Sequence, residues 1–95
     1  MNSAQILSTL RYDAALARLG VASLRLFGSA ARDAAVKGSD VDFLVRFSGA
    51  ATFDRYMDLK FFLEESLGVP VDLVTEDALR PEMRSAVEKE ALLVA

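Results

Sequence analysis

Two aspartates separated by one residue, Asp40 and Asp42, are the residues of this sequence best suited to chemistry. They open a run of alternating apolar residues that is typical of a β-strand, in which side chains two positions apart point to the same face. Two carboxylates on one face supply the oxygen ligands that a hard cation such as Mg2+ prefers. The pair therefore predicts a metal site, although alternating polar residues also occur on strands that simply face solvent.

The dipeptide Gly28-Ser29 precedes the aspartates and predicts an anion-binding turn. Glycine has no Cβ, so the backbone N–H groups of such a turn can approach a phosphate closely. Arg32 adds a cation three residues after Ser29, and Ser39 stands directly before Asp40. Each feature is common by itself. Their order, with a phosphate-binding turn and a metal site on one short connection, indicates chemistry on a nucleoside triphosphate.

A third carboxylate, Asp72, lies in a short predicted strand over residues 70–75. Alternation places Val71 and Leu73 on one face of this strand and Asp72 with Val74 on the other. A single aspartate in such a position is usually just solvent-exposed. If helices cover the apolar face of the sheet, however, Asp40, Asp42 and Asp72 share the opposite face, where they repel one another unless a cation neutralises them.

Composition narrows the possible functions. With 95 residues the chain predicts one domain, residues 1–95, and its net charge of −3 argues against direct nucleic-acid binding. The chain contains no cysteine and no histidine, which excludes thiolate metal sites and histidine-dependent nucleophiles. The start of the chain is unlike a signal peptide and no apolar run is long enough for a bilayer, so we expect a cytoplasmic protein without membrane contact.

The order of predicted elements indicates an α/β (α+β) fold in which helices pack on one face of a small mixed sheet of about three strands. Turn residues and hydrophobic periodicity predict the segments. The helices cover residues 3–19, 29–35, Phe53–Leu67 and a last segment from about Pro81 to the Leu92-Leu93-Val94 run, and the strands cover Val21–Phe27, 40–47 and 70–75.

The run Gly28-Ser29-Ala30-Ala31-Arg32, followed by Ser39-Asp40-Val41-Asp42, resembles the signature of the DNA polymerase beta nucleotidyltransferase superfamily, and above all its minimal, MNT-type members. The resemblance covers nearly the whole chain and implies the polymerase-beta-type fold. It implies that Asp40, Asp42 and Asp72 hold two Mg2+ ions and that Gly28 and Ser29 hold the triphosphate of ATP. Arg32 and Ser39 match the basic residue and the serine of the family pattern.

The same resemblance implies a reaction and a partner. MNT-type proteins are commonly encoded beside a HEPN-domain toxin, act as its antitoxin, and can transfer AMP from ATP to a tyrosine hydroxyl of the toxin. Asp72 is then also the candidate acceptor of the hydroxyl proton, because the chain has no histidine. Two departures leave substrate preference open. Asp33 stands where the family often has glycine, and Arg46 stands where many relatives carry an acidic residue.

The competing hypothesis is a non-catalytic antitoxin or binding module that silences its partner by forming a complex. The helix over Phe53–Leu67 keeps it open, because this helix is apolar around much of its circumference. One stripe is the expected core face: Tyr56, Leu59, Phe62, Leu63 and Leu67. The second stripe contains Phe53, Met57 and Phe61, which either widen the core face or contact another protein chain.

Overall fold

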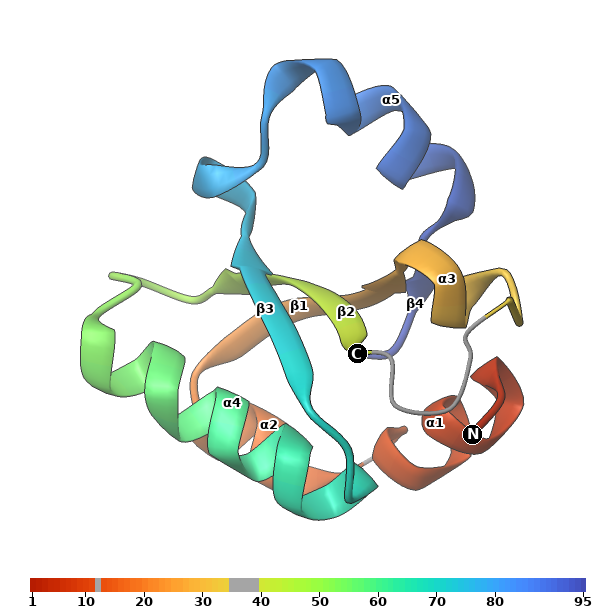
Figure 1. Cartoon of the computed structure of the whole chain (residues 1–95). Helices are drawn as coiled ribbons and strands as arrows, with labels where there is room; N and C mark the ends of the chain where they lie inside the picture. The colour runs from red at the N-terminus through yellow and green to blue at the C-terminus, as the bar shows by residue number, and fades with distance from the viewer. Residues whose placement is uncertain (12, 35–39) are drawn as a thin grey trace.

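The computed structural model describes residues 1–11, 13–34 and 40–95, which form a four-stranded mixed sheet with helices around it (Figure 1). The strands are β1 (Val21–Phe27), β2 (Val41–Phe47), β3 (Val71–Thr75) and β4 (Leu92–Leu93), in the spatial order β3-β2-β1-β4. β2 pairs with β1 in antiparallel and with β3 in parallel orientation. The predicted fold class is confirmed, with one strand more than expected.

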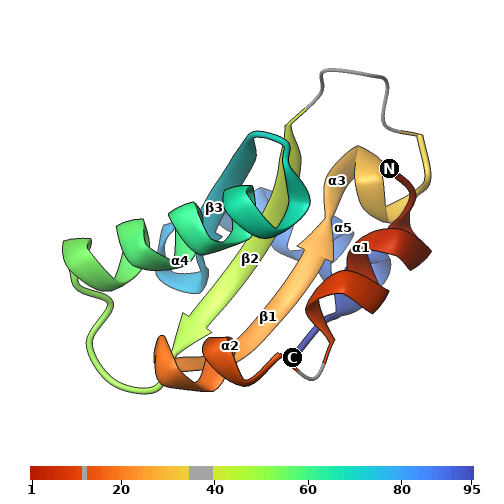
Figure 2. The same cartoon turned by 90° about the horizontal axis from the view of Figure 1, so that it is seen from below.

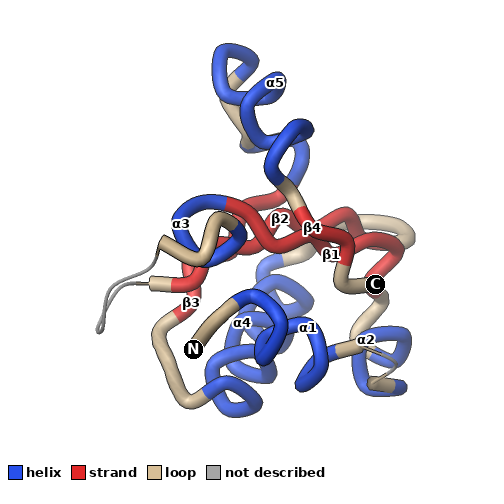
Figure 3. The backbone as a smooth tube through the Cα atoms, turned by 90° about the vertical axis from the view of Figure 1, so that its right-hand side faces the viewer, coloured by secondary structure: helices blue, strands red, loops and turns tan. Residues whose placement is uncertain are grey.

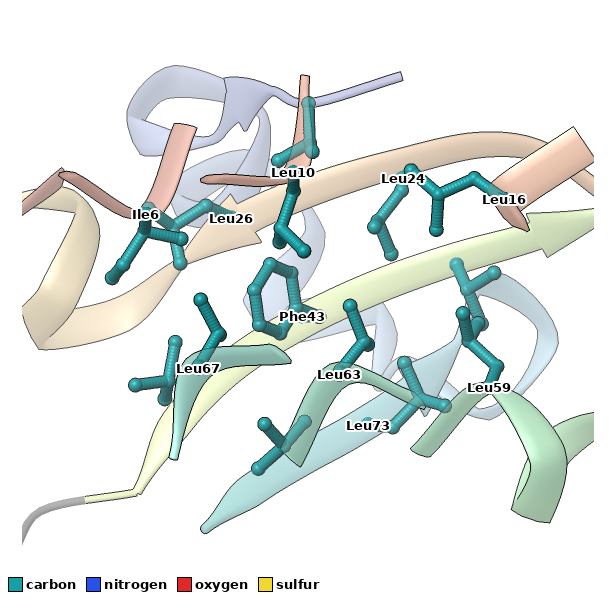
Figure 4. Packing of buried hydrophobic residues seen from close by; sticks show 14 of the residues in the cluster. Ile6, Leu10, Leu16, Leu24, Leu26, Phe43, Leu59, Leu63, Leu67 and Leu73 are labelled. Carbon is teal, nitrogen blue, oxygen red and sulfur yellow. The ribbon is translucent and has the colours of Figure 1, made fainter. Parts of the chain in front are cut away.

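Three helices cover one face of the sheet: α1 (Ser3–Leu10), α2 (Ala14–Arg18) and α4 (Phe53–Leu67) (Figures 2 and 3). Thr52 caps α4 at its start and Gly68, in the left-handed conformation, ends it, as the sequence predicts. The side chains predicted to face inward from the strands pack against these helices. Figure 4 shows this core, whose labelled members are Ile6, Leu10, Leu16, Leu24, Leu26, Phe43, Leu59, Leu63, Leu67 and Leu73.

The opposite face of the sheet is partly covered by α5 (Pro81–Glu90), which follows the short 3-10 helix η1 (Glu76–Ala78) (Figure 3). The expectation that this face is left open is therefore too simple. A second, smaller hydrophobic cluster of Phe27, Leu44, Leu79 and Val87 forms beneath α5. Phe27 and Leu44 belong to the same sheet face as the aspartates, and burying their apolar surface favours a covering element there.

The N-terminal segment forms two helices where the sequence predicts one helix over residues 3–19. Asn2, rather than Ser3, caps α1 through a reciprocal pair of hydrogen bonds with Gln5. The side chain of Asp13 accepts a hydrogen bond from the N–H of Ala15 and starts α2. A capping aspartate satisfies the free N–H groups of a new helix, which favours a break at this position over one continuous helix.

The C-terminal residues differ from the prediction as well. α5 ends at Glu90, and Leu92 and Leu93 form β4 instead of continuing the helix. β4 pairs with β1 in antiparallel orientation and satisfies backbone groups along an edge that would otherwise be unpaired. None of the helices in residues 1–11, 13–34 and 40–95 combines the length and the apolar character needed to cross a bilayer.

Candidate active site

Asp42 of β2 and Asp72 of β3 are direct partners across the parallel strand pair. The flanking residues Val41, Phe43, Val71 and Leu73 point into the main core, so alternation places both carboxylates on the other face. This is the face over which α5 lies. Strand register thus brings together two carboxylates that are 30 residues apart in the sequence, as the sequence analysis predicted for this face.

The environment of Asp42 raises the pKa of its carboxyl group to about 6. Partial burial is the largest cause, because it removes water from the charged form. The negative charge of Asp72, a hydrogen bond with that side chain and the charge of Asp40 act in the same direction, while Arg32 opposes them. When both carboxyl groups are ionised they repel each other, and a bound cation would relieve that repulsion.

Gly28 is the residue that lets the turn after β1 approach this pair. It begins α3 (Gly28–Ala31) with a positive φ of 71°, a conformation that glycine adopts without steric cost. A Cβ at this position would overlap the Oδ2 atom of Asp42. Backbone conformation and the close approach to Asp42 therefore both favour glycine, and the phosphate-binding role of the Gly28-Ser29 turn stays a prediction.

A cavity of about 830 Å³ lies between the sheet and α5 and contains most of the predicted site residues. Gly28, Ser29, Arg32, Asp42 and Asp72 all line it. Its volume falls within the range of roughly 300–1,000 Å³ that is typical of small-molecule sites. The apolar part of the lining comprises Val74, on the same strand face as Asp72, and Leu79, together with Met83, Ala86 and Val87 of α5.

Arg32 lies at the C-terminal end of α3 and forms an ion pair across the cavity with Glu90 of α5, with 2.7 Å between its Nη1 and the Glu90 Oε2. Both side chains are roughly half exposed and both line the cavity. The sequence analysis missed Glu90. Nothing in the local sequence marks it, because its partner is 58 positions away and the contact depends on where α5 folds back.

Asp33 occupies the position where the family often has glycine, and its backbone explains that preference. Its φ of 56° lies in the left-handed region, which most residues avoid and aspartate tolerates better than most. The Asp33 side chain accepts hydrogen bonds from the N–H of Ser3 at 2.7 Å and from its hydroxyl at 3.1 Å. These bonds lower the pKa of Asp33 and attach the start of α1 to the turn beside the site.

The remaining predicted residues lie less centrally. Asp40 is exposed, directly before β2, and it does not line the cavity, although its charge reaches Asp42. Ser39 lies outside the described residues. Within residues 1–11, 13–34 and 40–95, no three acidic side chains stand close enough together to form a ready metal-ligand cluster. The structure therefore joins Asp42 with Asp72, and the three-carboxylate site stays a prediction.

Comparison with protein-family models matches residues 11–94 to the nucleotidyltransferase domain. The chain belongs to this family. The protein adenylyltransferase MntA of Thermococcus cleftensis is 36% identical over 77 residues, which cover 81% of this chain and 78% of that protein. The resemblance inferred from the Gly-Ser and Asp-x-Asp residues is thereby confirmed, as is the assignment of the chain to the nucleotidyltransferases.

This chain also shares its fold with solved structures. The structure of a minimal nucleotidyltransferase superposes with a TM-score of 0.78 at 38% identity, covering 97% of this chain and 95% of that one. A crystal structure of a toxin–antitoxin complex with AMP-PNP has a TM-score of 0.72 and covers 100% of this chain and 73% of that one. Its identity is only 20%, so that similarity shows the fold alone.

The carboxylate pair of this nucleotidyltransferase fits a divalent cation on chemical grounds. Its donors are carboxylate oxygens, which Mg2+ prefers, and burial together with the negative charge of Asp72 raises the pKa of Asp42. A cation between them would reverse that effect.

Arg46, the second departure from the family pattern, lies four positions along β2 from Asp42, and its Nε is 4.0 Å from the Glu76 carboxylate. It belongs to the far end of the strand.

Proposed function

We propose that this protein is a Mg2+-dependent protein adenylyltransferase that moves AMP from ATP to a hydroxyl group, in particular to a tyrosine of a partner HEPN-domain toxin, and thereby acts as an antitoxin. The observation that carries the proposal is the Asp42–Asp72 pair in one cavity with the Gly28-Ser29 turn and Arg32. The similarity to an adenylyltransferase named MntA supports it.

The residues of the cavity divide the work of such a transfer. The Gly28-Ser29 turn and Arg32 bind the triphosphate, and Arg32 offsets the charge of the leaving pyrophosphate. Asp42 and Asp72, with Asp40 as the proposed third ligand, hold the metal. Mg2+ bound there, as two ions in the active complex, would polarise the phosphate and the acceptor hydroxyl. Ser39 is proposed to complete the nucleotide site from the start of the strand.

The proposed reaction is an in-line displacement at the α-phosphorus of ATP. The acceptor oxygen forms a bond to the α-phosphorus while the bond from that phosphorus to the oxygen bridging to the β-phosphate breaks. Pyrophosphate leaves with the electron pair of the broken bond, and the protein acceptor becomes a phosphodiester of AMP. Asp72, the exposed member of the carboxylate pair, takes up the proton of the hydroxyl group.

The test is incubation of the purified protein with labelled ATP, Mg2+ and the product of the neighbouring gene, as the proposed HEPN-domain partner, followed by mass spectrometry of both chains. Wild type should add AMP to a tyrosine of the partner. Asp42→Asn should lower the rate by about 100-fold or more, the order expected when a preorganised charged group at the reacting centre is lost. Asp58→Asn, an exposed residue of α4, is the matched control and should transfer at the wild-type rate.

The alternative function is a non-catalytic antitoxin that binds its partner and transfers nothing. The observation that favours it is exposed apolar surface on α4, since Phe53 is 75% and Phe61 is 58% exposed. In this alternative only, Phe53, Met57 and Phe61 form the contact with the partner or with a second copy of this chain. Neutralisation of the toxin by Asp42→Asn as effective as that by wild type would favour this alternative. A cytoplasmic location is part of either proposal.

A further inference from the structure

A second cavity, of about 580 Å³, lies beside the first one, where the N-terminal end of α4 meets β3 and η1. Phe53, the first residue of α4, lines it together with Tyr56 and Thr75. Val74 and Ala78 line both cavities, so the two hollows adjoin along β3. Nothing in the proposed chemistry uses this second cavity.

Phe53 is not needed for the core. Leu59, Leu63 and Leu67 of the same helix are buried and supply its packing surface, whereas 75% of Phe53 is exposed to water. Together with Tyr56 and Val74 it forms continuous apolar surface along the hollow, and continuous exposed apolar surface marks interaction sites. Phe61 is also exposed and lies two turns along the same helix, but it lines neither of the two cavities.

The second cavity lies close to the reacting groups. Val74 and Asp72 are two residues apart on β3 and share a face, so they are separated by about 7 Å along the strand. An extended polypeptide advances about 3.3–3.6 Å per residue. A chain segment bound against Phe53 and Val74 therefore reaches the carboxylate pair with a residue only a few positions away.

We infer that the surface formed by Phe53, Tyr56, Val74 and Ala78, called here the Phe53 surface, docks a segment of the protein acceptor and presents its hydroxyl group to Asp72. This inference rests on the proposed function and adds the place where the acceptor binds. The occupant is a polypeptide with an apolar or aromatic side chain. Exposed carboxylates next to the surface in the sequence, Asp54 and Asp77, disfavour a polyanion such as a nucleic acid or an anionic membrane.

Two backbone groups along the edge of β3 already have side-chain partners. The hydroxyl of Tyr56 donates a hydrogen bond to the carbonyl oxygen of Leu73 at 2.6 Å, and the N–H of Val71 donates to the carboxylate of Glu64 at 3.0 Å. These contacts occupy outward-facing groups of the strand, so docking through an added β-strand is disfavoured. Side-chain contacts with Phe53 therefore carry the recognition.

The experiment compares Phe53→Ser with Phe61→Ser, because both variants remove an exposed phenylalanine from α4. The probes are ATP with Mg2+ and the proposed HEPN-domain partner, the product of the neighbouring gene. Phe53→Ser should raise the KM for the protein acceptor about tenfold or more, as expected on truncation of an aromatic anchor, and should leave the Kd for ATP unchanged. Phe61→Ser should change neither value by more than about twofold, and Phe53→Tyr should restore the acceptor KM.

Each other outcome has a definite meaning. Equal losses in both variants, or no loss in Phe53→Ser, overturn the assignment of the Phe53 surface. A shift of Phe53→Ser to a smaller species in size-exclusion chromatography, with an unchanged acceptor KM, shows that a second copy of this chain occupies the surface. If wild type transfers no AMP, the proposed function fails. The docking inference is then decided by the Kd for the HEPN-domain protein, which Phe53→Ser should weaken and Phe61→Ser should not. Absence of that binding in wild type overturns both.

Discussion

At the scale of single residues, the site depends on two carboxylates that the fold holds together at a cost. Asp42 has a raised pKa because it is partly buried and because Asp72 stands beside it. An isolated aspartate would ionise near pH 3.9, so between that value and pH 6 the folded protein favours a proton on Asp42 that solvent would not. A cation at the proposed metal site would therefore favour the ionised form of Asp42. The pKa of Asp42 also reports how strongly the two carboxyl groups interact.

The first prediction concerns this pKa. In metal-free protein, Asp72→Asn should lower the pKa of Asp42 from about 6 towards its usual value, because a negative neighbour is replaced by a neutral one. Carboxyl carbon shifts followed by NMR across a pH series measure it directly. Asp58→Asn should leave the Asp42 titration where it is. If the pKa of Asp42 stays at about 6 in Asp72→Asn, burial alone causes the shift and the pair is not coupled.

At the scale of elements, the Arg32–Glu90 ion pair joins the end of α3 to α5, and both residues line the cavity of the proposed nucleotide site. Glu90 engages Arg32 through one guanidinium nitrogen, at 2.7 Å. A triphosphate that binds to the same guanidinium meets the negative charge of Glu90. The half-exposed ion pair is worth only about 0.2–1 kcal/mol, so bound phosphates can displace it.

The second prediction follows from that competition. Glu90→Gln should tighten ATP binding by about twofold to fivefold, the affinity equivalent of the ion pair that no longer competes for Arg32. AMP, which lacks the β- and γ-phosphates, should respond less. Glu82→Gln, in the same helix and lining the same cavity, is the matched control and should respond less than Glu90→Gln. Calorimetry at constant ionic strength measures the affinities of wild type and both variants for ATP and for AMP.

A weaker affinity for ATP in Glu90→Gln would contradict the prediction. It would show that Glu90 holds Arg32 in its binding position rather than competing with the nucleotide. In the double variant with Arg32→Ala, the effect of Glu90→Gln should largely disappear, because both act through one guanidinium group.

At the scale of the whole molecule, the carboxylate pair links folding to pH and, through the proposed metal site, to Mg2+. The pKa of Asp42 is raised in the folded state, so the folded chain binds more protons than the unfolded chain between about pH 4 and pH 6. In metal-free protein, the contribution of Asp42 to stability is therefore most favourable below that window and is lost as the pH rises through it. A bound cation at neutral pH opposes this loss.

The third prediction is a set of thermal melts at neutral pH. Mg2+ should raise the melting temperature of wild type by an amount that grows with its concentration, through binding to the folded state. Asp72→Asn should melt higher than wild type without metal and should gain less from Mg2+, because one substitution removes a repulsive neighbour and a ligand. NaCl keeps the ionic strength constant, since screening also relieves repulsion.

One combined result would remove the metal site from the account. If wild type shows no Mg2+ shift even with ATP present, and Asp72→Asn is destabilised with and without metal, Asp72 is a structural group.

Acid stability provides an independent check on the fold near the site. The pKa of Asp33 is lowered by its bonds with Ser3, so that contact stabilises the protein at neutral pH and is lost on acidification.

Local sequence patterns determined which side chains lie on which face. The alternation in β2 and β3 was sufficient to separate Val41, Phe43 and Leu73 from the aspartates, because the side-chain period of a strand is fixed by its backbone. The Gly28-Ser29 turn was also predictable from a local pattern, a Gly-Ser pair at the end of a strand, whereas the positive φ of Gly28 and its closeness to Asp42 come from the structure. The family resemblance supplied the proposed roles of these residues, and family models and relatives confirmed the family itself.

Only the tertiary structure decided what those faces meet. The register that sets Asp42 beside Asp72 depends on how β3 returns along β2 after α4, and the sequence pattern does not encode that crossover. The Arg32–Glu90 pair, the formation of β4 by Leu92 and Leu93, and the cover that α5 places over Phe27 and Leu44 arise in the same way. Each joins segments that are far apart in the chain. Burial of apolar surface and pairing of backbone groups across the whole domain select these contacts, and local periodicity in the sequence indicates neither of them.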